Sequence, residues 1–139
     1  MDDYFLAKSR LFTDYLPASG KSAKAAVING DDARGRELLS KAQHAGLATW
    51  SYGSGEECDI KPLEVYHNVS GQSGKIKVKD RVVEFSSELI GAANLDNILA
   101  AVSVGFALRI PQTAIVEGIR KLRSVPGRLQ RVENSRGVL

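Results

Sequence analysis

The sequence has little cysteine, few aromatic residues and no long hydrophobic run. Its single cysteine, Cys58, cannot form a disulfide within the chain, which is typical of a protein from a reducing compartment. Aromatic residues make up only 6% of the 139 residues, so the core must consist mainly of aliphatic side chains and alanine. The most apolar segment, residues 98–108, is too short to cross a bilayer, and no stretch is typical of a secretion signal. We expect a soluble, cytoplasmic protein.

The residues that commonly carry nucleophilic, metal or phosphate chemistry form no recognisable site. Cys58 lies in the acidic segment "GSGEECDIKP", which disfavours a reactive thiolate. Neither His44 nor His67 has carboxylates or cysteine at metal-ligand spacing, so both are interpreted as structural. The segment "SGKS", residues 19–22, resembles the end of a P-loop. However, Tyr15 stands where the first glycine of that pattern is required, and a predicted helix rather than a strand precedes it.

The net charge of +3 is small, and most charges are spread along the chain. Only Lys75, Lys77 and Lys79 form a dense cationic row. No aromatic residues alternate with these lysines, so a solvated strand face explains the row better than nucleic-acid binding does. A basic nucleic-acid-binding module is nevertheless kept as an alternative function.

The first third of the chain predicts a parallel β-α-β unit. Residues 2–16 read as a helix that ends at Pro17, and an apolar strand follows at residues 24–29. A second helix is predicted over residues 31–46, before a second strand at residues 47–53. Two strands joined by a helix are typically parallel, with a right-handed crossover.

The remainder predicts an antiparallel sheet and two helices. Residues 59–89 alternate polar and apolar residues and contain two turn signals, which indicates three antiparallel strands. Residues 94–110 are apolar nearly all round, so we expect a central helix covered on most sides, and Pro111 opens a further helix. A turn and strand are predicted over residues 125–134. The expected class is α/β. The apolar ending "SRGVL" favours a fragment of a longer protein.

Lys8 interrupts the apolar pattern of the first predicted helix, in the segment "YFLAKSRLF". At about 100° per residue, it falls between Phe12 and a row of three apolar side chains, Tyr4, Leu11 and Tyr15. In one interpretation its stem packs while its ammonium reaches water. In the other, a semi-buried amine spends more time neutral, reacts with carbon dioxide to form a carbamate, and coordinates a hard cation such as Mg²⁺. The residues alone leave both interpretations open.

Two further polar motifs are candidates for ligand contacts. In "GAANLDN", Asn94 and Asn97 lie three residues apart on one face of a predicted helix start. Helix capping explains one of them, whereas an amide can also read the donor and acceptor edge of adenine. In "PGR", Arg128 follows a tight turn and can present its guanidinium to phosphate, although a surface turn is an equal explanation.

Four segments taken in order resemble the middle part of the Mur ligases: "MDDYFLAKSRLF", "AVINGDD", "GAANLDNILAAVSVGFAL" and "VPGRLQRVE". The first helix is most similar to the branch of the family that adds the third amino acid, diaminopimelate or L-lysine, to UDP-N-acetylmuramoyl-L-alanyl-D-glutamate. The family uses ATP and Mg²⁺ to convert a carboxylate to an acyl phosphate, which the incoming amine attacks. The resemblance therefore implies a ligase of peptidoglycan synthesis.

The resemblance also implies roles for particular residues. Lys8 matches the carbamylated lysine that helps to hold magnesium, and Asn94 and Asn97 match asparagines at the adenine. Arg128 matches an arginine near the nucleotide, and Asp32 matches a recurrent aspartate. Ala93 departs from the family, which has an aromatic residue or histidine there.

The resemblance further implies how much of the enzyme this chain contains. Residues 1–139 are expected to form the C-terminal part of the central, ATP-binding domain. The UDP-binding domain, the P-loop half and the C-terminal ligase domain would lie outside the chain. We therefore expect the chain alone to be inactive, and the full-length enzyme to bind the UDP-linked dipeptide and the diamino acid, without nucleic-acid or membrane partners. A fragment of a folylpolyglutamate synthase-like ligase is the alternative within the enzyme class.

Overall fold

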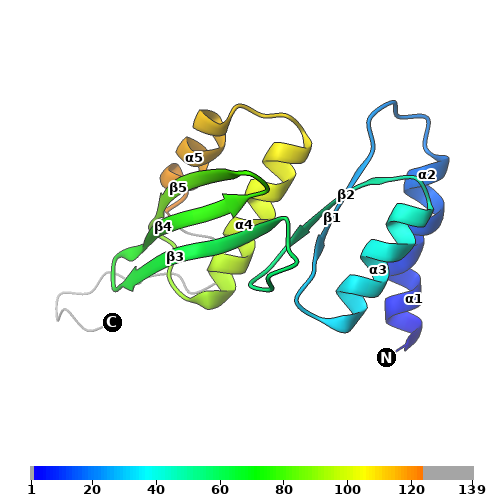
Figure 1. Cartoon of the computed structure of the whole chain (residues 1–139), viewed down its shortest axis with the longest axis horizontal. Helices are drawn as coiled ribbons and strands as arrows, with labels where there is room; N and C mark the ends of the chain where they lie inside the picture. The colour runs from blue at the N-terminus through cyan, green and yellow to red at the C-terminus, as the bar shows by residue number, and fades with distance from the viewer. Residues whose placement is uncertain (1, 124–139) are drawn as a thin grey trace.

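A computed structural model describes residues 2–123, in which five strands form one mixed sheet (Figure 1). The strands are β1 (Ala25–Asn29), β2 (Ala48–Tyr52), β3 (Ile60–Asn68), β4 (Gly71–Val78) and β5 (Arg81–Ser87). They lie in sequence order, with β1 and β2 parallel and β3, β4 and β5 antiparallel. The predicted α/β class is confirmed. The parallel unit and the antiparallel strands are joined by one parallel pair, Tyr52 with Ile60.

Helices lie on both sides of the parallel strands. They are α1 (Asp2–Arg10), the π-helix η1 (Leu11–Tyr15), α2 (Leu16–Ala18), α3 (Ala33–His44), α4 (Ala92–Ala107) and α5 (Gln112–Lys121). On one side, Ala26 and Ile28 of β1 form a small core with Ala42 of α3, and Phe12 and Leu16 pack against it. On the other side α4 contacts β1, β2 and β3, while α5 contacts β5 (Figure 1).

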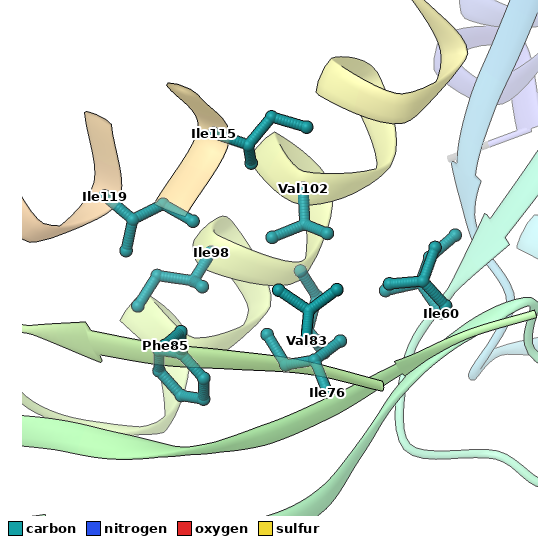
Figure 2. Packing of buried hydrophobic residues seen from close by; sticks show 10 residues of the cluster. Ile60, Ile76, Val83, Phe85, Ile98, Val102, Ile115 and Ile119 are labelled. Carbon is teal, nitrogen blue, oxygen red and sulfur yellow. The ribbon is translucent and has the colours of Figure 1, made fainter. Parts of the chain in front are cut away.

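The main core is aliphatic, as the composition predicted. Figure 2 shows side chains of the antiparallel strands, among them Ile60, Ile76 and Val83, meeting α4 and α5. Val102 of α4 lies at the centre and is fully buried. Among residues 2–123, Phe85 is the one aromatic residue that is buried. The sheet therefore depends on α4 to cover its inner face.

The first predicted helix differs from the structure in two ways. It is divided into three segments, because a wider π-turn begins at Leu11. The Ser9 hydroxyl donates to the Phe5 carbonyl at 2.8 Å, and such side-chain bonds compete with the helical ladder and bend it. The prediction that Pro17 ends the helix is also wrong, since Pro17 lies in the first turn of α2, where proline is tolerated.

The prediction for the apolar helix is partly wrong. α4 begins at Ala92 rather than at Asn94, and its N-cap residue is Gly91. Its outer face is exposed at Val104, and Leu108, the residue that follows its end, has an exposed fraction of 66%. The helix is apolar all round, but within residues 2–123 only its inner faces are packed. The strand predicted over residues 125–134 lies outside the described residues. No helix of the described part is long and apolar enough to span a bilayer.

The central position of α4 predicts a large difference between two leucine substitutions. Leu99 of α4 is 1% exposed, whereas Leu63 of β3 is 47% exposed. We expect Leu99→Ala to lower the free energy of unfolding by about 2–5 kcal/mol through lost burial and a residual cavity. Leu63→Ala should lower it by about 1 kcal/mol or less. Urea denaturation measures both, and equal losses would contradict the central role of α4.

Candidate functional site

The two predicted asparagines lie together at the beginning of α4 and line one cavity. The cavity has a volume of about 240 Å³. Its lining residues are Leu89, Asn94, Asn97, Ile98, Ala101, Ile119 and Leu122. All but the two asparagines are apolar. Ligand sites typically combine an apolar lining with a few convergent polar groups, and this volume is below the roughly 300–1,000 Å³ of pockets for drug-sized ligands. The cavity therefore has room for only part of a ligand of that size.

The two amides have different surroundings. Asn94 is buried, and its Nδ2 donates to the Ile90 carbonyl at 2.7 Å. Its Oδ1 accepts a longer bond of 3.4 Å from Nδ2 of Asn97. No side chain caps α4, so the interpretation of Asn94 as a helix cap is wrong. Asn94 anchors the turn, while Asn97 is exposed at the cavity and can present a donor and an acceptor to a ligand.

Asp31 ties together the loops that follow β1 and β2. Its carboxylate accepts bonds from the Ser54 backbone N–H at 2.9 Å, the Ser54 hydroxyl at 3.0 Å and the Gly55 N–H at 2.9 Å. Burial raises the pKa of Asp31, but these hydrogen bonds outweigh it and hold the pKa below its ordinary value. A Cβ atom on Gly53, whose φ is +151°, would approach Asp31 Oδ1 to 2.3 Å. A glycine is therefore required beside this carboxylate.

Asp96 of α4 lies close enough to Asp31 for the two charges to interact. Burial raises the pKa of Asp96, and the negative charge of Asp31 raises it further. Burial also raises the pKa of Tyr52 at the end of β2, with a second contribution from the charge of Asp96. The first turns of α4 thus meet the carboxyl ends of the parallel strands, which is where open α/β sheets bind ligands.

Asp32, the predicted aspartate, has a structural role that accounts for its position. It is the N-cap of α3, and its Oδ1 accepts a bond of 2.6 Å from the Gly35 N–H. The neighbouring Asp31, which the sequence did not single out, is the carboxylate at the strand ends. The segment "GDD" indicated a turn with two aspartates. Nothing in it distinguished Asp32, which caps α3, from Asp31, which bonds to the loop after β2.

Lys8 does not lie in a semi-buried site, so that part of the prediction is wrong for the described chain. Its side chain is exposed, and its Nζ lies 4.3 Å from the centroid of the Tyr4 ring. Tyr4, Leu11 and Tyr15 are exposed too, because the helix turns Phe12 toward the small core instead. Within residues 2–123, no group of three histidine, cysteine or acidic residues could hold a metal ion.

A family profile for the Mur ligase middle domain matches residues 1–105. The chain belongs to the Mur ligase family. The UDP-N-acetylmuramoyl-L-alanyl-D-glutamate--2,6-diaminopimelate ligase of Geobacter metallireducens is 42% identical over 139 residues, which are 99% of this chain and 27% of that protein. The chain thus spans about a quarter of the length of the curated relatives that it matches. The resemblance seen in four sequence motifs is confirmed at the level of the family.

Solved structures agree with this membership. A structure of a UDP-N-acetylmuramoyl-L-alanyl-D-glutamate--2,6-diaminopimelate ligase matches 96% of this chain with a TM-score of 0.81 and 26% identity, and the match covers 27% of that structure's chain. A structure of a mutant L. casei FPGS matches 78% of this chain with a TM-score of 0.62 and 15% identity, and the match covers 27% of that chain. At this identity the second similarity shows a shared fold alone.

Other residues of this Mur ligase chain are placed as follows. Arg128 lies outside the described residues. The three lysines of the cationic row do not share one face: Lys75 pairs with Glu64 at 3.2 Å, while Lys79 lies 4.1 Å from the centroid of the Trp50 ring. This arrangement gives no support to the nucleic-acid alternative.

Cys58 is buried, and burial raises its pKa with a further contribution from Asp31, consistent with an unreactive thiol.

The coupling between Asp31 and Asp96 can be tested by titration. Because the pKa of Asp31 is lowered on folding, its hydrogen bonds stabilise the fold above its ordinary pKa of about 4 and lose this effect on acidification. In Asp31→Asn, the pKa of Asp96 should fall toward its ordinary value but stay above it, because burial is the larger cause. Side-chain carboxyl ¹³C NMR measures the midpoint. Asp80→Asn, at the β4–β5 turn, is the control, and an unchanged midpoint in Asp31→Asn would contradict the coupling.

Proposed function

We propose that this chain is the nucleotide-binding part of an ATP-dependent ligase that adds diaminopimelate to UDP-N-acetylmuramoyl-L-alanyl-D-glutamate in peptidoglycan synthesis. The observation that carries the proposal is the Asn94–Asn97 cavity, found in a chain whose similar relatives bear that name. We propose a cytoplasmic location as well, because ATP and UDP-linked substrates are nucleotides of the cytoplasm.

The cavity supports a role in holding the adenine ring of ATP. Asn97 can direct one amide donor and one acceptor toward the edge of the base, and Asn94 holds Asn97 in place. The apolar walls, including Ile98 and Ala101, would cover the faces of the ring and exclude water. When bound with Mg²⁺, ATP supplies the phosphoryl group that activates the substrate carboxylate. Binding and orientation of the base are the contributions of the described residues.

The rest of the proposed activity requires other parts of the parent enzyme. The sequence has no complete P-loop pattern, and residues 2–123 contain no cluster that could hold a metal. We infer that residues 1–139 form the C-terminal part of the central domain. The phosphate cradle, the metal ligands, and the sites for the UDP-linked dipeptide and the diamino acid would then come from the remaining three quarters of the enzyme. The 27% coverage of the similar ligase supports this division.

We propose further that Lys8 becomes a carbamate and supports Mg²⁺ only in the complete enzyme. Its neighbours Tyr4, Leu11 and Tyr15 form an exposed apolar surface, which is typical of a face that another part of a protein covers. Covering this face would exclude water around Lys8 and favour its neutral, reactive amine. A metal ion would then hold the carbamate by charge.

The adenine assignment predicts which substitution weakens ATP binding. Asn97→Ala removes the donor and the acceptor of one amide from the cavity and leaves Asn94 in place, so we expect ATP to bind about tenfold more weakly, the effect of one good polar contact. Asn68→Ala, at the end of β3, is the matched control and should leave the affinity unchanged. Titration of each ¹⁵N-labelled variant, followed at the backbone N–H groups of Ile98 and Ala101, measures both affinities. Equal affinities in the two variants would overturn the assignment.

The Lys8 proposal predicts different results for the chain and for the whole ligase. With ¹³C-bicarbonate near neutral pH, the chain alone should show no carbamate carbon resonance, because Lys8 is exposed in it. The full-length enzyme with Mg²⁺ should show one, and Lys8→Arg should remove it. Lys21→Arg, in the loop after α2, is the control. A carbamate at Lys8 in the chain alone would show that no covering segment is needed.

A further inference from the structure

A second cavity lies at the other end of α4 from the asparagine pair. Its volume is about 510 Å³. The tip of the β4–β5 hairpin forms one wall and the α4–α5 connection forms another, with Trp50 of β2 between them. Asn97 and Arg109 are twelve positions apart along and just past α4, which corresponds to about 18 Å at 1.5 Å per residue. The second cavity is therefore separate from the proposed adenine site.

The lining of this cavity combines cations with apolar surface. Lys79, Arg81 and Arg109 contribute three positive charges, and Asp80 is the one carboxylate among the lining residues. The apolar part comes from Trp50, Val78, Phe106, Ile110 and Pro111. None of the three cations forms an ion pair with any residue in 2–123. Elsewhere on the sheet, by contrast, Lys75 and Lys61 are each paired with a glutamate.

Two of these cations lie in a backbone conformation that favours glycine. Lys79 has φ +52° and Arg109 has φ +58°, and they are the only non-glycine residues with positive φ in the described part of the chain. Arg109 follows the C-cap of α4, and the carbonyls of Gly105 and Phe106 accept from the N–H groups of Ile110 and Arg109. This is the position where glycine is most common at a helix end. A charged residue is thus present at two positions where glycine would fit better, and both line the same cavity.

The beginning of α5 also favours negative charge in this cavity, and the end of α4 opposes it only weakly. The last carbonyls of α4 are engaged by the bonds described above, which reduces the negative potential at that end. α5 begins at Gln112, directly after Pro111, and no side chain caps it, so its positive end faces the cavity wall. This effect adds to the three cationic side chains.

We propose that the second cavity binds a small organic anion with a flat apolar body. A phosphate or carboxylate group lies among Lys79, Arg81 and Arg109, and the body lies against Phe106 and the edge of Trp50. Lys79 already covers one face of Trp50, with its Nζ 4.1 Å from the ring centroid, so the ligand meets an ordered ammonium there. The site is independent of the proposed adenine cavity.

Trp50 gives a direct measurement of this site, because it is the only tryptophan in the chain. We would titrate the ¹⁵N-labelled full chain with phenyl phosphate and with benzoate, and follow the single indole N–H resonance. Both anions carry an aromatic body, whereas phenol has the same ring with neither group and serves as the neutral control. Saturable shifts with either anion, weakened at about 0.5 M NaCl, are expected. The anion that binds more tightly identifies the preferred group.

Glycine substitutions separate binding from folding. Arg109→Gly and Lys79→Gly each remove a cation but place glycine where it is conformationally preferred, so thermal stability should be unchanged or higher. The affinity for the preferred anion should fall at least about tenfold in each variant. Lys77→Gln, on the exposed side of the same hairpin, removes one charge away from the cavity and should bind as the unchanged chain does.

Three results would overturn the proposal. The first is the absence of a saturable indole shift with both anions. The second is an equal shift with phenol, which would indicate an apolar contact without charge recognition. The third is an Arg109→Gly chain that keeps the original affinity. Binding of ATP at the asparagine cavity is measured at other resonances, so its presence or absence does not change the interpretation.

Discussion

The structure depends on the burial of one apolar helix, α4, between two parts of the sheet. Val102 and Leu99 lie at the centre of the main core, and the helix contacts β1 and β2 on one side and β3 and α5 on the other. The parallel and antiparallel strands share only one residue pair at their junction, Tyr52 with Ile60. The common contact with α4 therefore holds the two parts of the sheet in one arrangement.

This placement of α4 also determines where ligands can bind. Its first turns bring Asn94 and Asn97 to the small cavity, and bring Asp96 to the strand ends beside Asp31. The turn that follows its C-cap brings Arg109 to the cationic cavity. Polar residues occur at both ends of an otherwise apolar helix, where they can contact ligands without disturbing the packing of its middle. In the proposed ligase, the adenine would be held by the same element that supports the core.

Local patterns in the sequence predicted most of the fold. The strand alternation of residues 59–89 and the helix expected over residues 31–46 depend on neighbouring residues, and both are present. Asn94 and Asn97 could be paired from their spacing on one helix face. The exposed position of Lys8 could not be predicted, because a π-turn after Arg10 changes the face that the helix presents. Contacts distant in sequence were not predictable either: Asp31 bonds to Ser54, and Lys79 lies near Arg109 only through the fold.

In the proposed complex, the adenine of ATP lies against α4 at Asn97. Intermolecular NOEs between the H2 and H8 protons of adenine and the side-chain protons of the chain would locate the base. We expect NOEs to Ala101, Ile98 and Ile119, which line the asparagine cavity. NOEs only to Ile110 or to the Trp50 ring, which line the other cavity, would contradict it.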